Sequence, residues 1–207
     1  RVLFEKNAFA LRSLASLAKL MTALLAEELI PPGVFVPISA QAIRQEGDSG
    51  FVAGEKFKKE DLRDFMLAAS SNDAAYAFAQ FLGEGIGGGQ KAAVSKFVAL
   101  MNERARGLNM FRTSFLTPHG LDQFINNQEI SGASGTAYEM ALLMEYLYKT
   151  HPRILAGTRQ PEIKIVSEEG RELLAANTNR AARTLPQLIA SKTGFTDLAG
   201  GNLVFIF

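Results

Sequence analysis

Residues 16–29 read SLAKLMTALLAEEL and are followed by PPG at 31–33. Apolar side chains at 17, 20, 21, 24 and 25 recur at helical spacing, which predicts a helix, and the prolines and glycine predict its end. Lys19, Glu27 and Glu28 interrupt the apolar run, which is therefore too short and too charged to span a bilayer. We expect this stretch to be a buried helix in the core.

Helical signals continue outward from this stretch along the middle of the chain. The helical rhythm of apolar residues recurs at 59–70, 73–82 and 90–108. Thr136 followed by Glu139 forms a capping-box pattern, which predicts a further helix running to about residue 149. The middle of the chain is therefore expected to be helical.

Short β-prone runs lie at 1–5, 162–167, 185–192 and 202–207. Strands toward both ends and helices between them predict an α+β fold, with one antiparallel sheet built from both ends and flanked by helices. A helical subdomain would then face the sheet across a cleft. We expect one catalytic domain over residues 1–207, and the strand-like runs at both termini suggest that it is truncated at both ends.

Composition excludes several classes of function. The chain has 207 residues, a formal net charge of +1 and no cysteine. The absence of a basic surplus makes nucleic acid a poor candidate partner. Disulfides, thiolate catalysis and zinc–thiolate sites are excluded because they need cysteine. No signal-peptide pattern begins the chain.

Three short motifs contain the residue types that acyl transfer needs, and each occurs once: Ser16-Leu17-Ala18-Lys19, Ser70-Ser71-Asn72 and Lys192-Thr193-Gly194. Singly, the first two are weak signals, whereas Lys-Thr-Gly is expected by chance in about one chain of this length in twenty. Together and in this order they match the motif set of penicillin-recognising serine enzymes.

The first motif has a direct chemical interpretation. Ser16 and Lys19, three residues apart at a helix start, share one face, so the lysine can act as base toward the hydroxyl. Lys19 can do so only if its pKa falls, which burial and a nearby cation such as Lys192 would cause. Without the other motifs, a buried helix with a snorkelling lysine would be the commoner structure.

The second and third motifs could complete a site. Ser70 and Asn72 lie at a break between helices, where capping is the usual role, but they could also relay a proton and bind a substrate amide. Lys192 and Thr193 could bind a carboxylate or orient the serine–lysine pair. The residues that follow the strand, Gly194 and Phe195, have backbone roles. Gly194 would allow close backbone approach, and the Phe195 N–H would form an oxyanion hole with the N–H of Ser16.

Two further patterns are weaker candidates. The sequence from Gly83 to Gly88 satisfies G-x-G-x-x-G, but a helix precedes it, which indicates a loop between helices rather than a dinucleotide site. His119 and His151 lack partners at metal-ligand spacing and are expected to be structural or solvent-facing. Asp73 is interpreted as a first-turn helix charge. No metal or other cofactor is therefore predicted.

Four stretches around the motifs carry a family resemblance over nearly the whole chain: RSLASLAKLMTA (12–23), GEKFKKEDLRDFMLAASSNDAAYA (54–77), GLNMFRTSFLTPHGLD (107–122) and SKTGFTDLAG (191–200). Residues 177–179 also resemble a family landmark. The chain resembles the low-molecular-mass penicillin-binding proteins that are D-alanyl-D-alanine carboxypeptidases. Ala18 stands where that family often has Thr.

The resemblance implies a penicillin-binding transpeptidase and β-lactamase-like fold and assigns roles to the matching residues. Ser16 would attack the penultimate D-Ala carbonyl of a peptidoglycan stem peptide, Lys19 would be the base, and Ser70 with Asn72 would assist. Lys192, Thr193 and Gly194 would line the facing strand. β-Lactams would acylate the same serine. The resemblance also implies a periplasmic or other extracytoplasmic location, with any membrane anchor outside this chain.

Three alternatives remain open at the level of sequence. A peptidoglycan D,D-endopeptidase is a variant within the family. A serine β-lactamase would need a Glu followed four residues later by Asn, and the nearest pair, Glu172 and Asn177, is five apart. A non-hydrolytic domain that binds β-lactam or peptidoglycan would show the same motifs.

Overall fold

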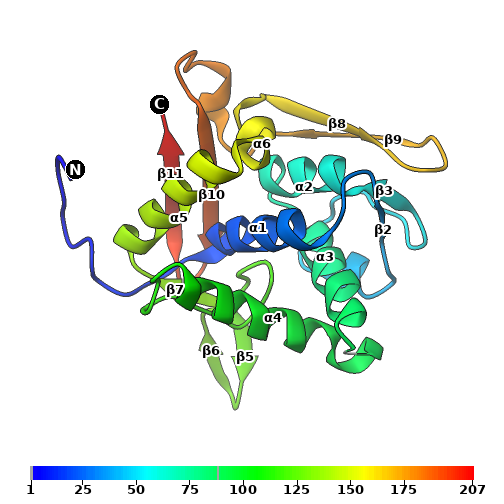
Figure 1. The fold of residues 1–207 in the computed structure, drawn as a ribbon, viewed down its shortest axis with the longest axis horizontal. Coiled ribbons are helices and arrows are strands. Elements are labelled where there is room, and N and C mark those ends of the chain that lie inside the picture. Colours follow the sequence, from blue (N-terminus) through cyan, green and yellow to red (C-terminus); the bar gives the residue numbers. More distant parts are fainter. Residues whose placement is uncertain (1, 88) are drawn as a thin grey trace.

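The computed structural model describes residues 2–87 and 89–207, and it has the α+β class expected from the sequence. Helix α1 (Lys19–Leu29) runs through the centre, and the other long helices pack around it (Figure 1). The remaining helices are α2 (Lys59–Ala68), α3 (Asn72–Gly85), α4 (Gly89–Gly107), α5 (Ala137–Thr150) and α6 (Pro152–Leu155). The four predicted helices beyond α1 are confirmed as α2, α3, α4 and α5.

Helix α1 is central because its sequence is apolar on nearly every side. All side chains from Lys19 to Ala26 are buried, and Lys19 and Thr22 are the only polar ones among them. A helix without a polar face is stable only inside the core. A short 3₁₀ turn, η1 (Ala15–Ala18), precedes α1 and carries Ser16. The predicted helix at 16–29 is therefore confirmed, with a tighter first turn.

Side chains at the start of α5 show why this helix begins where it does. Thr136 caps α5 by accepting a hydrogen bond from the N–H of Glu139. The Glu139 carboxylate accepts bonds from the backbone N–H of Arg112 and the hydroxyl of Thr113. It therefore joins α5 to a neighbouring loop and is not the second half of the predicted capping box.

The strands form short antiparallel ladders. Within residues 2–87 and 89–207 they make five separate sheets, one of three strands and four of two. Their bounds are β1 (Arg12–Ser13), β2 (Phe35–Pro37), β3 (Lys56–Lys58), β4 (Ser114–Phe115), β5 (Gln123–Ile125), β6 (Gln128–Ile130), β7 (Ala133–Gly135), β8 (Glu162–Val166), β9 (Glu172–Ala176), β10 (Ala190–Thr196) and β11 (Gly200–Ile206). The pair β10–β11 carries the third motif, with Lys192 opposite Val204.

The prediction of one sheet built from both ends is wrong for the described residues. Strand β1 pairs with β7, whereas β10 pairs with β11 and β8 with β9. The expected strand at 1–5 is also absent over residues 2–5; Arg1 lies outside the described residues. Leu3 and Phe4 are 84% and 83% exposed. An apolar run that lacks a partner strand cannot form the hydrogen-bond ladder of a β-sheet.

The strand expected at 185–192 begins later than predicted. Strand β10 starts at Ala190, because a loop with Leu185 half-exposed follows the short 3₁₀ turn η4 (Arg180–Arg183). The strands predicted at 162–167 and 202–207 are confirmed as β8 and β11.

The glycine-rich pattern at 83–88 was expected to be a loop between helices, but residues 83–85 form the last turn of α3, and only Ile86 and Gly87 lie in the connection to α4; Gly88 is outside the described residues. A Cβ on Gly83 would lie 1.9 Å from the carbonyl oxygen of Ala93. This glycine therefore allows two helices to pack closely, which explains it without a nucleotide.

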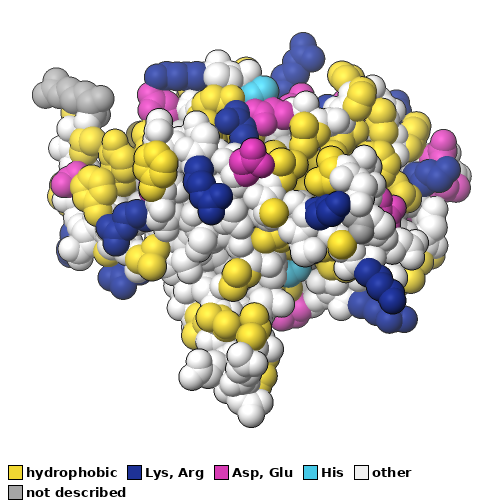
Figure 2. Space-filling view, turned by 60° about the horizontal axis from the view of Figure 1, so that its bottom comes forward, with side chains coloured by type: hydrophobic (Ala, Val, Ile, Leu, Met, Phe, Trp, Pro, Cys, Tyr) yellow, Lys and Arg dark blue, Asp and Glu magenta, His cyan; other side chains and the backbone are white. Residues whose placement is uncertain are grey.

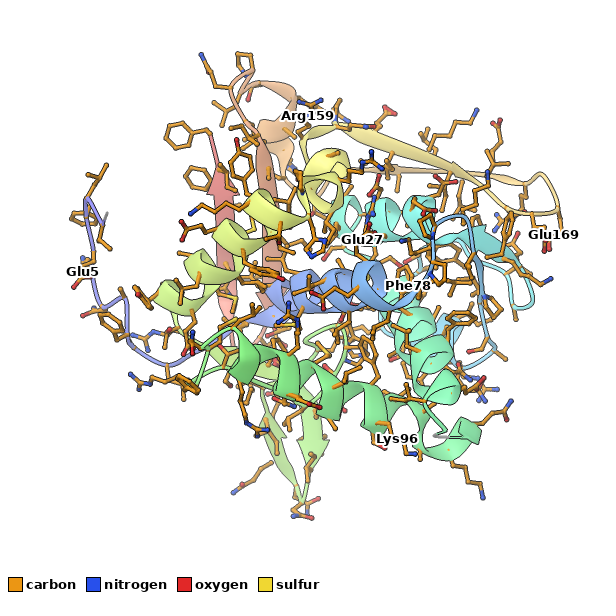
Figure 3. The ribbon with its side chains drawn as sticks, viewed as in Figure 1. Glu5, Glu27, Phe78, Lys96, Arg159 and Glu169 are labelled. Atoms are coloured by element: carbon orange, nitrogen blue, oxygen red, sulfur yellow. The ribbon has the colours of Figure 1, made fainter. Side chains whose placement is uncertain are left out.

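The surface has two conspicuous features. The β5–β6 hairpin stands out from the body, with hydrophobic side chains near its base, and lysine and arginine side chains are scattered over the face shown in Figure 2. At the C-terminal end of α1, Glu27 lies beside α2 (Figure 3), where it pairs with Arg63 at 2.7 Å. No helix of the described residues combines the length and apolarity needed to cross a membrane.

Candidate active site

The first residue of α1, Lys19, links the first two motifs. Its Nζ lies 2.7 Å from Ser16 Oγ, 2.6 Å from Asn72 Oδ1 and 3.0 Å from the carbonyl oxygen of His119. The side chain is fully buried, so these three acceptors replace its water shell. The helical i, i+3 spacing therefore produces the predicted contact between Ser16 and Lys19.

The three partners define where a neutral lysine would direct its lone pair. The amide oxygen of Asn72 and the carbonyl of His119 can only accept hydrogen bonds, whereas the Ser16 hydroxyl can also donate. When Lys19 loses one proton, its two remaining N–H groups can satisfy those two acceptors. Its lone pair then faces Ser16, the one of these three partners that can donate a proton.

Electrostatics favours that neutral form. Burial lowers the pKa of Lys19 well below its usual value, and the positive charge of Lys192 lowers it further. The carboxyl group of Asp73 acts in the opposite direction but is the smallest of the three influences. A buried amine with a depressed pKa beside a serine hydroxyl is the arrangement that a general base needs.

Backbone packing positions the turn that carries Ser16. A Cβ on Gly194 in β10 would lie 2.9 Å from the Leu14 carbonyl oxygen and 3.2 Å from the Ser16 nitrogen. On another side, a Cβ on Gly120 would lie 1.9 Å from the carbonyl oxygen of Ala15. Ala15 itself has a positive φ of 48°, which is strained for a residue with a side chain. Both glycines thus allow neighbouring chain segments to pack closely against η1, the turn that carries Ser16.

The second motif occupies the tight turn between α2 and α3. Ser70 has a positive φ of 60°, and the hydroxyl of Ser71 caps α3 by accepting from the Ala74 N–H. Because Ser71 makes the cap, Ser70 and Asn72 are free for other contacts. Asn72 Nδ2 donates to the carbonyl oxygen of Glu46 at 2.6 Å, which fixes the amide with its oxygen toward Lys19.

The third motif brings a second buried lysine. Lys192 is 1% exposed, and its Nζ lies 2.8 Å from Ser70 Oγ and 2.7 Å from the Thr193 carbonyl oxygen. Burial lowers its pKa to about 7. The Thr193 hydroxyl lies 2.6 Å from that of Thr178. The fold therefore brings side chains of all three motifs into two adjoining hydrogen-bond networks, one around each lysine.

Comparison with known proteins identifies the family. The profile described as D-alanyl-D-alanine carboxypeptidase matches residues 1–206. The chain belongs to this family. Curated D-alanyl-D-alanine carboxypeptidases of Bacillus subtilis and Mycobacterium tuberculosis are 30% and 31% identical to it over 202 and 191 residues. Those alignments cover 95% and 92% of this chain and 48% and 60% of the relatives, so the chain spans roughly half of each relative's length.

Solved structures agree with the family assignment. A D-alanyl-D-alanine carboxypeptidase from Mycobacterium tuberculosis superposes with a TM-score of 0.81 at 25% identity, covering 97% of this chain and 70% of that one. The penicillin-binding protein fold expected from the resemblance is therefore confirmed. The departures from the expected sheet concern strand pairing, the missing strand over residues 2–5 and the later start of β10.

Sequence reasoning missed the contribution of His119 in this carboxypeptidase-family fold. Its ring is buried, with Nε2 3.1 Å from Gln45 Oε1, and Nδ1 accepts from the Leu121 N–H at 3.2 Å. Burial, followed by the charge of Lys19, lowers the pKa of His119 to about 3. His119 is structural, as expected, but its backbone carbonyl is one of the three acceptors around Lys19. A backbone contact of this kind leaves no side-chain pattern in the sequence.

Sequence reasoning also missed the burial of Asp73 and the change in its pKa. It is 2% exposed, one of its carboxylate oxygens, Oδ1, has no hydrogen-bond partner in the described residues, and burial raises its pKa to about 6. The prediction of a simple first-turn helix charge is therefore incomplete. The other histidine, His151, lies 3.7 Å from Glu28 at the far end of α1 and takes no part in the site.

Phe195 lines one of two surface cavities near the three motifs. The Phe195 ring is 70% exposed and lines a cavity of about 150 Å³ together with Glu46, Leu121, Asp122, Glu129, Thr196 and Asp197. A larger cavity of about 400 Å³ lies beside Ala69 at the end of α2. Ser16 lines neither cavity. No group of three metal-ligating side chains occurs among residues 2–87 and 89–207.

Proposed function

We propose that this chain is the catalytic domain of a serine-type D-alanyl-D-alanine carboxypeptidase, with Ser16 as nucleophile and residues 1–207 as one unit. The main support is the 2.7 Å contact between Ser16 Oγ and a buried Lys19 whose pKa is depressed. Membership of the carboxypeptidase family supplies the substrate class, peptidoglycan stem peptides ending in D-Ala-D-Ala.

In the proposed acylation step, Lys19 takes the proton of Ser16 while Oγ bonds to the carbonyl carbon of the penultimate D-Ala. The carbonyl oxygen becomes an oxyanion, stabilised by the N–H groups of Ser16 and Phe195. The peptide C–N bond then breaks, and a proton returns to the leaving D-Ala nitrogen. Ser70, which accepts a hydrogen bond from Lys192 at 2.8 Å, is the proposed relay for that proton.

In the proposed deacylation step, water attacks the ester carbonyl at Ser16 and its proton passes to Lys19. The bond between the acyl carbon and Ser16 Oγ then breaks, Lys19 returns the proton to Oγ, and the shortened stem peptide leaves. The substrate would lie along β10, where backbone groups can pair with an extended peptide. Asn72 would bind a backbone amide, and Lys192 with Thr193 would bind the terminal carboxylate. Gly194 permits the close approach of β10 to Ser16.

Two further statements belong to the same proposal. β-Lactams would acylate Ser16, because their amide carbonyl presents the same reacting group. Since the substrate is in the cell wall, the enzyme would work outside the cytoplasmic membrane, in the periplasm or its equivalent. Neither step requires a metal or cofactor.

A labelled penicillin tests the proposal. It should form a covalent adduct on the wild type that mass spectrometry maps to the peptide containing Ser16, and no adduct on Ser16→Ala. A linear D-Ala-D-Ala peptide should then release D-Ala. An adduct at another residue, or none, would refute the nucleophile.

Three parallel substrates separate the alternatives. Preference for a cross-linked dimer over the linear peptide would indicate an endopeptidase, and rapid turnover of a chromogenic cephalosporin a β-lactamase. A stable adduct without peptide turnover would indicate a non-hydrolytic binding domain.

A further inference from the structure

The segment 177–179 lies beside the third motif and is not used in the proposed mechanism. Its central residue, Thr178, points its hydroxyl at the hydroxyl of Thr193, with 2.6 Å between the two oxygens. Thr178 is exposed to solvent. Because this surface threonine contacts a proposed substrate-binding residue, it is a candidate for a role in substrate binding.

Two buried asparagines hold this threonine in place. Asn177 Nδ2 donates to the carbonyl oxygens of Thr158 and Gln160 at 2.7 and 2.8 Å. Asn179 Nδ2 donates to the hydroxyl of Ser191 in β10 at 2.8 Å. Both amides are 9% exposed. The backbone of Thr178, which lies between them, is therefore held close to β10, where its side chain reaches Thr193.

The Thr178 hydroxyl can direct its hydrogen bond in either of two ways. Its backbone N–H donates to the Ala68 carbonyl oxygen at 3.0 Å, and its hydroxyl lies 3.2 Å from the same oxygen. That carbonyl can only accept, so the Thr178 hydroxyl can donate to it while accepting from Thr193. Alternatively, the Thr178 hydroxyl can donate to Thr193, and the Ala68 carbonyl keeps the backbone N–H.

The second arrangement is the one that helps to bind an anion. When the Thr193 hydroxyl donates a hydrogen bond to a carboxylate, its oxygen can still accept one, and the Thr178 hydroxyl can donate to it. A chain of hydroxyl donors ending on a charged acceptor strengthens each bond in the chain. Lys192, whose side chain is buried beside Thr193, supplies positive charge to the same region.

We propose that Thr178 is a positioning residue for substrate recognition, orienting the Thr193 hydroxyl as a donor to the free carboxylate at the end of the acyl donor. This inference rests on the proposed function and adds a residue to it. It predicts that Thr178 distinguishes acyl donors that end in a carboxylate from donors that lack one. The backbone N–H of Thr178 donates to the Ala68 carbonyl oxygen, so this tie of the turn to α2 remains when the hydroxyl is removed.

The test compares two acyl donors on three proteins. One donor is an acyl-D-Ala-D-Ala peptide with a free carboxylate, and the other is the matching acyl-D-Ala aryl ester, whose leaving group carries none. Thr178→Val keeps the side-chain shape and removes the hydroxyl, whereas Thr178→Ser keeps the hydroxyl. Thermal unfolding of each variant checks that the fold is intact.

We expect Thr178→Val to reduce kcat/KM for the peptide by about three- to tenfold, the usual value of one hydrogen bond. The loss should appear mainly in KM, since the carboxylate is bound equally before and during acylation. Turnover of the aryl ester should stay unchanged, and Thr178→Ser should recover the peptide activity.

Equal losses on both donors would overturn the inference in favour of a purely structural role, and so would no loss on either. These outcomes are distinct from failure of the proposed function. A wild type that forms no penicillin adduct and processes neither donor would remove the proposed function, and this inference with it.

Discussion

A buried lysine lies at each end of α1, Lys19 as its first residue and Lys59 from α2 at its C-terminal end, and the two have opposite surroundings. At the C-terminal end, Lys59 is 1% exposed, with Nζ 3.0 Å from the Ile30 carbonyl oxygen and 3.1 Å from Glu27. At the N-terminal end, Lys19 is equally buried but makes no ion pair with any residue of 2–87 or 89–207. Its acceptors are neutral, and its strongest charged influence is another lysine, Lys192.

The difference shows that burial alone does not identify a functional lysine. A buried ammonium is costly unless an opposite charge compensates it. Glu27 provides that compensation for Lys59, together with Glu60 at 3.6 Å. Lys19 has hydrogen-bond partners but no such partner charge, so its neutral form is favoured and is available as a base. The same residue type is thus structural at one end of α1 and a candidate catalytic group at the other.

The largest expected effect is at Lys19. Lys19→Met keeps an apolar stem in the core but removes the base, so penicillin acylation of Ser16 should slow by about 10²–10⁴-fold, the usual value of general-base catalysis. The rate of adduct formation under pseudo-first-order conditions measures it. Acylation at the wild-type rate would contradict the base assignment.

The matched change at Lys59 should affect stability and spare the chemistry. Lys59→Met leaves the Ile30 carbonyl without its donor, which should lower the free energy of unfolding by about 1–3 kcal/mol. Glu27 retains Arg63 as a partner at 2.7 Å, which limits the loss. Urea unfolding measures the change. If Lys59→Met slowed acylation as strongly as Lys19→Met, the distinction between the two ends of α1 would fail.

A third prediction concerns the pH dependence of carboxylate binding by Lys192, whose pKa burial lowers to about 7. Below that pH the side chain is an ammonium ion that can bind the substrate carboxylate, and above it the amine is neutral. For the D-Ala-terminated peptide, kcat/KM should therefore fall as pH rises through about 7. The carboxylate-free aryl ester should show no such fall, and the same alkaline limb on both donors would contradict the assignment.

The pKa of Lys192 also sets a direction for stability. Its folded-state pKa of about 7 lies below the unfolded value of about 10.4, so between these pH values the unfolded chain binds more protons. The contribution of Lys192 to stability is therefore unfavourable below pH 7 and recovers as pH rises toward 10. Lys192→Met should flatten that part of the stability profile, measured by denaturant unfolding at several pH values.

The sequence could predict the contacts that depend on local geometry. Helical spacing places Ser16 beside Lys19, and that contact is present. The contact of Asn72 with Lys19, 53 residues apart, and the nearby charge of Lys192 could be expected only from the family resemblance. Backbone acceptors such as the carbonyls of Glu46 and His119 could not be predicted, because any residue type supplies them.

The fold was predictable to a similar extent. The helices follow from apolar periodicity, and the buried α1 follows from a sequence that is apolar all round. The prediction of strand pairing failed because pairing depends on which strand edges meet in space. The runs at 162–167, 185–192 and 202–207 were expected in one sheet, yet β8 pairs with β9, and β10 pairs with β11.

The smallest expected effect concerns Asp73, whose negative charge raises the pKa of Lys19. Asp73→Asn keeps the shape and removes that charge, so Lys19 should lose its proton more readily. The acidic limb of the penicillin acylation profile should then move to lower pH, by less than about one unit, since Asp73 is the smallest of the three influences on the pKa of Lys19. The effect should be confined to pH values above about 6, because below its own raised pKa Asp73 is already neutral.

Glu84→Gln is the matched control, because Glu84 is an exposed acid on the same helix, α3, and its loss should leave the profile in place. A move of the acidic limb to higher pH in Asp73→Asn would mean that Asp73 acts by holding Asn72 against Lys19 rather than through its charge. The difference between the two ends of α1 would then depend on the geometry of the acceptors around Lys19, and Asn72→Ala should reproduce the Asp73→Asn profile.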